Sequence, residues 1–190
     1  MGSSTLCCLI SMTVVFFLLI IPHAMGDGAT QARINFICKQ TDDINYCKGV
    51  FNAHLPGDVV DVKGLTQIAL TQTLIYASDT QIFIRRLEAG NNSTEIKNLL
   101  KICEVGYGII VDEFGNANLD FAKGDYRSML FDVEKCERFV NDCINVISGR
   151  VPELKVKNLH SKVLVRMSFI SGRELNGGRS NVHSIPPVGN

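Results

Sequence analysis

Apolar residues recur at steps of three and four residues along the chain from about position 63 onward. This period places side chains on one face of an α-helix, whereas a strand would alternate at every second residue. Four such stretches follow one another, at 65–87, 96–121, 129–147 and 154–170. Ile75, Ile82 and Leu159 are among the residues that this pattern predicts to face a core.

Short polar or glycine-containing segments separate the four stretches, and they are typical of helix ends and caps. In chain order they are Gly90, Asn92-Ser93, Lys123-Gly124, Asp125, Gly149 and Pro152. Gly106, Gly108 and Gly115 fall inside the second stretch, where each costs about 1 kcal/mol relative to alanine. We therefore expect a kink or a close helix contact in that helix.

These patterns predict an all-α protein whose residues 63–171 form an up-and-down four-helix bundle. Residues 27–62 precede it as an extension of two short helical pieces, with Cys38 and Cys47 on either side of Thr41-Asp42-Asp43. Residues 172–190 are rich in Gly, Asn, Ser and Pro, and we expect them to be a disordered tail after the 27–171 domain.

The first 26 residues have the pattern of a secretory signal peptide. An apolar run from Leu6 to Ile21 is followed by Pro22 and by the small-residue pattern Ala24-Met25-Gly26. The run is shorter than the roughly 20 apolar residues of a membrane span, and cleavage after Gly26 is expected. Residues 1–26 are therefore interpreted as a signal peptide of a secreted protein.

Charge and cysteine content limit the function classes. The chain has 19 basic and 19 acidic residues, and this balance gives no electrostatic basis for binding nucleic acid or an anionic membrane. Five cysteines remain after the signal peptide, which in an oxidising compartment indicates two disulfides and one spare thiol.

The turn between the second and third helices indicates which cysteines pair. Cys103 lies 20 residues before Lys123 and Cys143 lies 20 residues after it, so the two are level in an antiparallel hairpin. Cys136 is displaced by seven residues, or roughly 10 Å along the axis. We therefore expect Cys103–Cys143 and Cys38–Cys47 bridges, contributing about 4 and about 3 kcal/mol on a chain-entropy model, and a buried free Cys136.

The sequence offers no catalytic or metal-binding constellation. His54 and His160 are solitary, and no cysteine or histidine spacing matches a metal site. Asp112 and Glu113 are adjacent and diverge by about 100° on a helix, so they are expected on a solvated surface. We expect no cofactor, no metal and no enzymatic activity.

Two overlapping glycosylation sequons begin at Asn91 and Asn92, in the predicted turn between the first and second helices. Both asparagines are candidate acceptors, although the two sites cannot readily be occupied together. Asn92 is also a candidate cap for the second helix.

The chain resembles the plant invertase/pectin methylesterase inhibitor family over nearly all of residues 34–171. The resemblance rests on the signal peptide, the bracketed segment CKQTDDINYC, the helix opening DVKGLTQIAL, the segment LLKIC and a cysteine after a helical hairpin. It implies a four-helix bundle after a helical extension, with the same two disulfides. It also implies an extracellular or vacuolar protein that blocks the active site of a carbohydrate-active enzyme, and the spacing is most similar to the invertase-inhibitor-like branch.

The resemblance also points to a contact region at the turn into the third bundle helix. Invertase-inhibiting members carry a Pro-Lys-Phe motif there, and this chain has Tyr126, Arg127 and Ser128 after a retained Gly124-Asp125. Asp125, Tyr126 and Arg127 are therefore candidate partner-binding residues. The alternative is that Tyr126 packs on the end of the bundle and Arg127 is solvated.

The sequence thus predicts a secreted inhibitor of an acid invertase in the apoplast, cell wall or vacuole. Pectin methylesterase is the alternative target within the same family. A different class of protein would be an extracellular bundle that carries a small hydrophobic ligand in a cavity near Gly106 and Gly108. A pro-region of a larger pectin methylesterase is less favoured, because this sequence has no catalytic part after the bundle.

Overall fold

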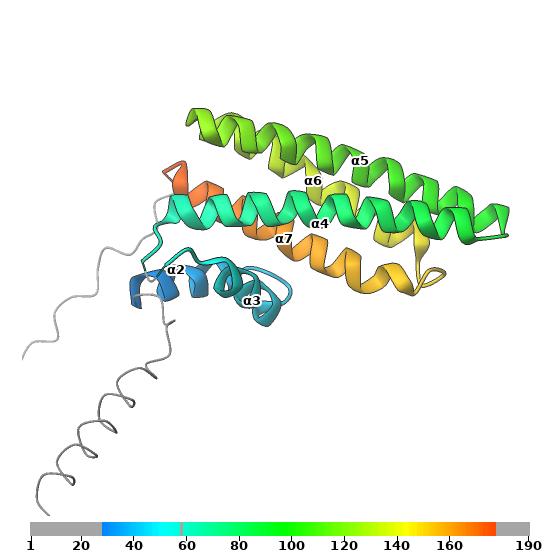
Figure 1. Cartoon of the computed structure of the whole chain (residues 1–190), viewed down its shortest axis with the longest axis horizontal. Coiled ribbons are helices and arrows are strands. Elements are labelled where there is room, and N and C mark those ends of the chain that lie inside the picture. The colour runs from blue at the N-terminus through cyan, green and yellow to red at the C-terminus, as the bar shows by residue number, and fades with distance from the viewer. Residues whose placement is uncertain (1–27, 58, 178–190) are drawn as a thin grey trace, which may run out of the picture.

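The computed structural model describes residues 28–57 and 59–177, and the regular structure in these ranges is entirely α-helical. Four long helices form an antiparallel up-and-down bundle in which each packs on the next and the last returns to the first (Figure 1). Two short helices form an extension beside one end of it. The predicted fold is confirmed. In chain order the helices are α2 (Gly28–Cys38), α3 (Ile44–His54), α4 (Val62–Gly90), α5 (Thr94–Lys123), α6 (Tyr126–Ile147) and α7 (Glu153–Leu175).

The ends of the bundle helices follow the polar residues between the apolar stretches. Asp61, Ser93 and Asp125 are N-caps whose side chains accept a backbone N–H from the first turn of α4, α5 and α6. Gly124 ends α5 in the left-handed conformation, with φ of 80°. The cap of α5 is thus Ser93, and the alternative that Asn92 caps it is wrong.

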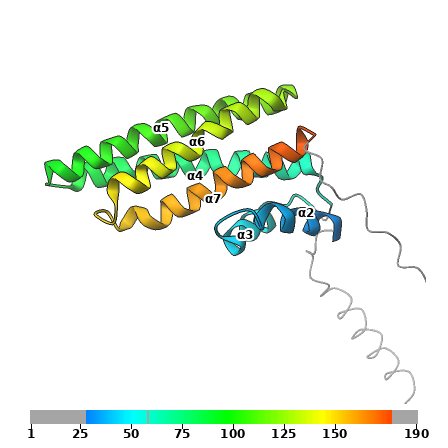
Figure 2. The same ribbon diagram turned by 180° about the vertical axis from the view of Figure 1, so that it is seen from behind.

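Helix α7 lies between two hydrophobic cores (Figure 2). The larger core fills the bundle, and α7 contributes Leu154 and Val165 to it. The smaller core lies under the extension, where Ile34 and Phe51 pack against Val163, Leu164 and other residues of α7. Helix α4 also contributes to both cores, so these two helices are buried on more than one side.

Three residues of the predicted core lie on the surface. Ile75, Ile82 and Leu159 are exposed, whereas threonines and small residues face inward. The buried residues of α4 do follow one series of three- and four-residue steps, but five of the eight are Thr or Ala, and on α7 the polar Asn158 faces inward beside Leu159. The buried residues of α4 are Leu65, Thr66, Ala69, Leu70, Thr73, Ala77, Thr80 and Ile84.

Glycines mark close helix contacts. Helix α5 is continuous through Gly106 and Gly108. A Cβ at Gly106 would lie 3.7 Å from the Cβ of Phe139, and one at Gly108 would lie 2.9 Å from Gln81 Nε2. Side chains of α6 and α4 therefore lie directly beside these two glycines.

Gly172 corrects the predicted boundary of the bundle. Helix α7 continues past residue 171 to Leu175, and Gly172 is buried against α6, where an added Cβ would lie 2.7 Å from Met129 Cε. A glycine that permits close packing was thus interpreted as a helix end. The predicted signal peptide at 1–26 and the part of the predicted tail beyond residue 177 lie outside the described residues.

Both disulfides join the cysteines that were expected to pair. Cys38 and Cys47 close the extension with Cα atoms 5.5 Å apart, and Cys103 and Cys143 link α5 to α6 with Cα atoms 4.8 Å apart. Cys136 is a buried free cysteine on the inward face of α6. The α5–α6 hairpin is therefore held covalently in the register that its turn defines.

Two threonines on α4 give a paired test of this packing. Thr73 Oγ1 lies 2.7 Å from the carbonyl oxygen of Ala69 and 3.0 Å from Ser168 Oγ, whereas Thr80 Oγ1 is buried without a hydrogen-bond partner among the described residues. An unsatisfied buried hydroxyl costs about 1–3 kcal/mol. Thr80→Val should therefore raise the free energy of unfolding by about 1 kcal/mol, and Thr73→Val should lower it by about 1–2 kcal/mol.

Urea denaturation of the disulfide-intact protein measures both changes. Because valine closely matches threonine in shape, each variant serves as the control for the other. Destabilisation of equal size in both variants would contradict the assigned environments.

Candidate partner-binding surface

The turn between α5 and α6 is rigidly formed at the end of the bundle. Asp125 Oδ1 accepts the backbone N–H of Ser128 at 3.1 Å, and its Oδ2 accepts the Ser128 hydroxyl at 2.8 Å. These hydrogen bonds, with the backbone bond first, lower the pKa of Asp125. Asp125 therefore remains ionised and caps α6. This structural role accounts for its presence at the turn without any contact to a partner.

The other two predicted contact residues lie in different environments. Tyr126 is half-buried and packs on Phe121, with ring centroids 5.9 Å apart. Arg127 is exposed and makes no ion pair within the described ranges. Of the three candidates, Arg127 is therefore the one whose functional group is freely available to a partner.

Four exposed apolar side chains extend the surface along the hairpin. Ile102, Val105 and Leu119 on α5 and Phe131 on α6 are between 51% and 65% exposed. We refer to these four residues and Arg127 as the hairpin face. These four residues were not predicted as a surface. Isolated exposed apolar residues are common, and on α5 and α6 they lie between the apolar residues that face the core.

An ion pair between the two helices supports this surface. Lys135 on α6 lies 2.8 Å from Glu113 Oε2 on α5, and its ammonium stands 4.5 Å from the centre of the Phe131 ring. Hydrogen bonding to Glu113, the largest of the contributions, raises the pKa of Lys135. Asp112 is exposed beside the paired Glu113, so the two carboxylates do not act together.

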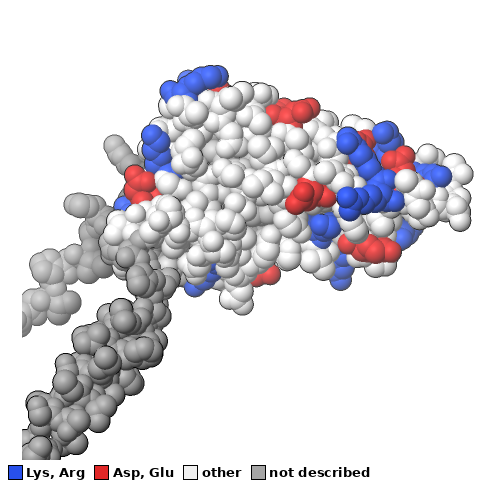
Figure 3. Space-filling model, in the orientation of Figure 1, with Lys and Arg blue, Asp and Glu red and all other residues white. Residues whose placement is uncertain are grey.

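A charged cluster joins α4 to α5 at the other end of the bundle. Glu104 is buried and accepts hydrogen bonds from Arg85 at 2.9 Å, Lys101 at 2.9 Å and Gln81 at 3.2 Å. Hydrogen bonds from Lys101 and then Arg85 lower the pKa of Glu104. Figure 3 shows charged side chains gathered toward this end, a broad uncharged area in the middle of the visible face and smaller charged groups at the opposite end and edges.

The extension covers the α4–α7 side of the bundle through specific contacts. The ring of Tyr46 stacks on His160, with centroids 3.7 Å apart, and Lys162 Nζ lies 2.8 Å from Asp42 Oδ2. Burial lowers the pKa of His160, which also lies 3.3 Å from the Tyr76 hydroxyl. His160 therefore belongs to the contact between the extension and the bundle.

The described part of the chain has no arrangement of groups typical of an enzyme. Among residues 28–57 and 59–177, no three His, Cys, Asp or Glu side chains are placed to hold a metal ion. His54 is exposed and bonds through Nδ1 to the carbonyl oxygen of Val50 at 2.8 Å. Burial raises the pKa of the Cys136 thiol to about 12, so it is protonated and a poor nucleophile. None of the helices in these ranges has the length and apolarity of a membrane span.

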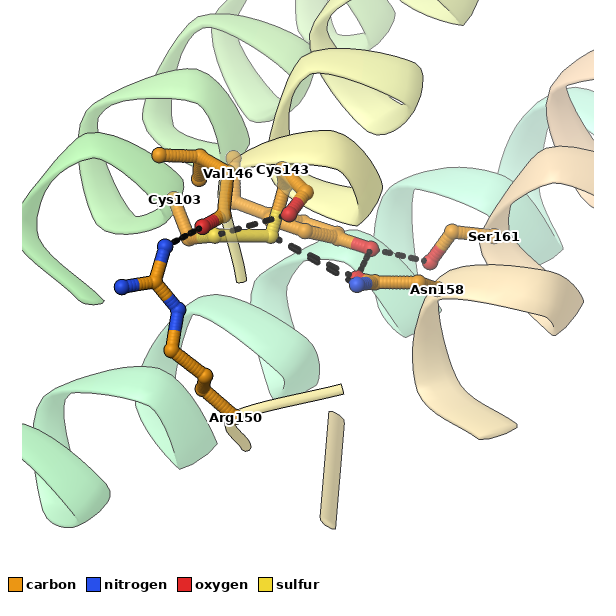
Figure 4. Close-up of a disulfide and its surroundings, with 7 residues drawn as sticks. Cys103, Cys143, Val146, Arg150, Asn158 and Ser161 are labelled. Atoms are coloured by element: carbon orange, nitrogen blue, oxygen red, sulfur yellow. Dashed lines mark hydrogen bonds between the residues drawn. A yellow bond between two sulfur atoms is a disulfide. The ribbon is translucent and has the colours of Figure 1, made fainter. Parts of the chain in front are cut away.

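A buried polar network surrounds the Cys103–Cys143 disulfide (Figure 4). The Tyr107 hydroxyl donates to Asn158 Oδ1 at 2.8 Å and lies 2.9 Å from Ser161 Oγ, and Asn158 Nδ2 lies 3.5 Å from Cys143 Sγ. Burial is the main cause that raises the pKa of Tyr107. This network fixes α7 against the stapled α5–α6 hairpin. Its only sign in the sequence is two polar residues, Asn158 and Ser161, within a helix.

These features define a class of protein: a disulfide-stapled helical bundle with exposed apolar side chains along one helical hairpin. The chain belongs to the plant invertase/pectin methylesterase inhibitor family, whose family model matches residues 32–165. It is 27% identical to Pectinesterase inhibitor 5 of Arabidopsis thaliana over 135 residues, which are 68% of this chain and 73% of the relative.

Two solved structures share the fold. One is a mutant form of a pectin methylesterase inhibitor from Arabidopsis, with a TM-score of 0.64 and 17% identity over 74% of this chain and 95% of that one. The other is a pectin methylesterase inhibitor from Arabidopsis thaliana, with a TM-score of 0.55 and 17% identity over 76% and 96%. At this identity the likeness concerns the fold alone.

The two sequons differ in how their asparagines are engaged. Asn91 Oδ1 accepts the backbone N–H of Ser93 at 2.9 Å, whereas Asn92 is exposed and its side chain has no partner among the described residues. We expect Asn92 to carry the glycan, because its side chain is exposed, whereas Asn91 is partly buried and held through Oδ1. Expressed in a secretory host, Asn92→Gln should abolish the mobility shift on glycosidase treatment, and Asn91→Gln should leave it. The reverse pattern would show that Asn91 is the acceptor.

Proposed function

We propose that this chain is a secreted, non-catalytic inhibitor that binds a pectin methylesterase and covers its substrate cleft. The observation that carries the proposal is the hairpin face, an exposed apolar surface on a covalently stapled helix pair in a chain of this inhibitor family. A rigid surface loses little conformational entropy when it binds, and this favours tight association.

The choice of pectin methylesterase over invertase rests on two observations. The curated relative described above is named as a pectinesterase inhibitor. At the α5–α6 turn, Tyr126 is half-buried and the Pro-Lys-Phe motif expected of invertase-inhibiting members is absent. The comparisons therefore do not support the preference for invertase, and they favour the alternative that the sequence analysis kept open.

The hairpin face is the favoured contact surface because the extension covers part of the opposite side of the bundle. Residues 65–69 of α4 and 163–170 of α7 pack under the extension, whereas α5 and α6 contribute no residue to that core. Arg127 stands at the turn, and an exposed arginine beside apolar residues is typical of interface centres. We propose that Ile102, Val105, Leu119, Arg127 and Phe131 contact the enzyme.

Residues 1–26 would direct this inhibitor into the secretory pathway, and the processed chain would begin at Asp27. The targets of such an inhibitor are enzymes of the cell wall or vacuole, so the apoplast is the proposed location, with the vacuole as the alternative. Two disulfides among the described residues suit an oxidising compartment.

The proposal predicts inhibition of pectin methylesterase by the purified mature protein, with no inhibition of acid invertase at the same concentration. Ile102→Asp should weaken inhibition at least about tenfold, because it places a charge on a side chain that the enzyme would bury. Ile82→Asp is the matched control: Ile82 is 45% and Ile102 is 51% exposed, and both lie on long bundle helices.

Inhibition constants measured across acidic and neutral pH decide between the outcomes. Equal weakening by the two variants would place the contact elsewhere than the hairpin face. Failure to inhibit either enzyme class at micromolar concentration would overturn the proposed function itself.

A further inference from the structure

A cavity of about 620 Å³ opens at the turn between α6 and α7, at the opposite end of the hairpin from Arg127. This volume lies within the range of pockets that hold small molecules, about 300–1,000 Å³. The chain turns here through Ser148 and Gly149, both in the left-handed region with φ of 32° and 78°. The principal lining residues are Ile144, Ile147, Val151, Lys155, Asn158 and Leu159.

The walls of the cavity are largely apolar. Ile147 and Val151 are almost fully buried at its base, and the exposed Leu159 stands at its rim. An apolar hollow of this size, with a small number of polar groups, favours a ligand whose body is hydrocarbon.

Besides Asn145 and Ser148, the cavity is bordered by two polar side chains with N–H donors, Lys155 and Asn158. Lys155 is exposed, and its ammonium has no ion pair or hydrogen bond within the described ranges. Asn158 is fully buried, and the acceptor nearest its Nδ2 is the disulfide sulfur of Cys143 at 3.5 Å, which is a weak acceptor for a group with two N–H donors. Residues three apart on a helix lie on the same face, so both donors border the same cavity.

Arg150, the other cation near this turn, is already paired and does not serve as a donor in the cavity. Its guanidinium lies 2.6 Å from Glu95 Oε1 and 3.2 Å from the carbonyl oxygen of Val146, which directs it toward α5 (Figure 4). The cation available at the cavity is therefore Lys155, and the complementary ligand group is an anion that accepts hydrogen bonds.

We propose that this cavity binds a small amphipathic carboxylic acid, with its hydrocarbon body among Ile144, Ile147 and Val151 and its carboxylate between Lys155 and Asn158. A charge-assisted hydrogen bond to Lys155 would select the acid over a neutral molecule of the same shape. The site is separate from the hairpin face and does not depend on the proposed inhibition.

Decanoate and 1-decanol test the proposal as probes of equal chain length and different charge. In titrations of the ¹⁵N-labelled, disulfide-intact protein, decanoate should shift amide signals of residues 144–159 and saturate with a Kd on the order of 1 mM or below. Decanol should bind at least about fivefold more weakly, because it lacks the carboxylate.

Two lysine variants distinguish binding of decanoate in the cavity from non-specific attraction of its negative charge to the basic helix α7. Lys155→Gln should weaken decanoate binding about tenfold and leave decanol binding unchanged. Lys157→Gln is the control, because Lys157 lies over the rings of Tyr76 and Phe83 instead of the cavity.

Any of three results would overturn the proposal. These are the absence of saturable binding of decanoate, decanoate shifts centred on the hairpin face, and equal effects of the two lysine variants. Equal affinity for decanoate and decanol would likewise contradict the assignment of the ligand as an acid.

Discussion

The arrangement of this molecule depends on the burial of α7 on two sides. One side of the helix closes the bundle core and another supports the extension, so α2 and α3 have a place to dock only while the bundle is formed. The stacking of Tyr46 on His160 and the Asp42–Lys162 ion pair add specific contacts to this docking. The extension packs on parts of α4 and α7 and leaves the α5–α6 hairpin uncovered, and the proposed function rests on this asymmetry.

The hairpin is also the best fixed part of the bundle. The Cys103–Cys143 bridge sets its register, the Glu113–Lys135 pair ties its middle, and the Asp125 cap defines its turn. The Tyr107–Asn158–Ser161 network then places α7 against it. A buried polar network of this kind is satisfied in few arrangements, so it specifies how the helices meet more than it stabilises them. Such a scaffold suits binding through a preformed surface.

The sequence predicted the fold and the pairing of cysteines, because helical periodicity and the length of a hairpin are local properties. It placed Met129, Val133, Cys136 and Val140 inward on α6, a helix that faces a single core. It failed at Ile75, Ile82 and Leu159, because the inward faces of α4 and α7 contain many Thr, Ala, Asn and Ser residues, which a search for large apolar residues does not assign to a core. It also interpreted Gly172 as a helix end, although the glycine serves close packing on α6. The hairpin face could not be predicted for a related reason: an apolar residue is assigned to the surface only after the core is known.

The most direct test of the central claim is side-chain footprinting of the protein alone and in complex with pectin methylesterase. Hydroxyl radicals oxidise exposed apolar side chains, so mass spectrometry reports which of them become covered. The account predicts that Ile102, Val105, Leu119 and Phe131 lose reactivity in the complex, whereas Phe36 and Ile44 of the extension region and Val156 of α7 keep theirs. Protection of Phe36, Ile44 and Val156 with an unchanged hairpin face would contradict it, because the enzyme would then bind the side that we assign to the extension.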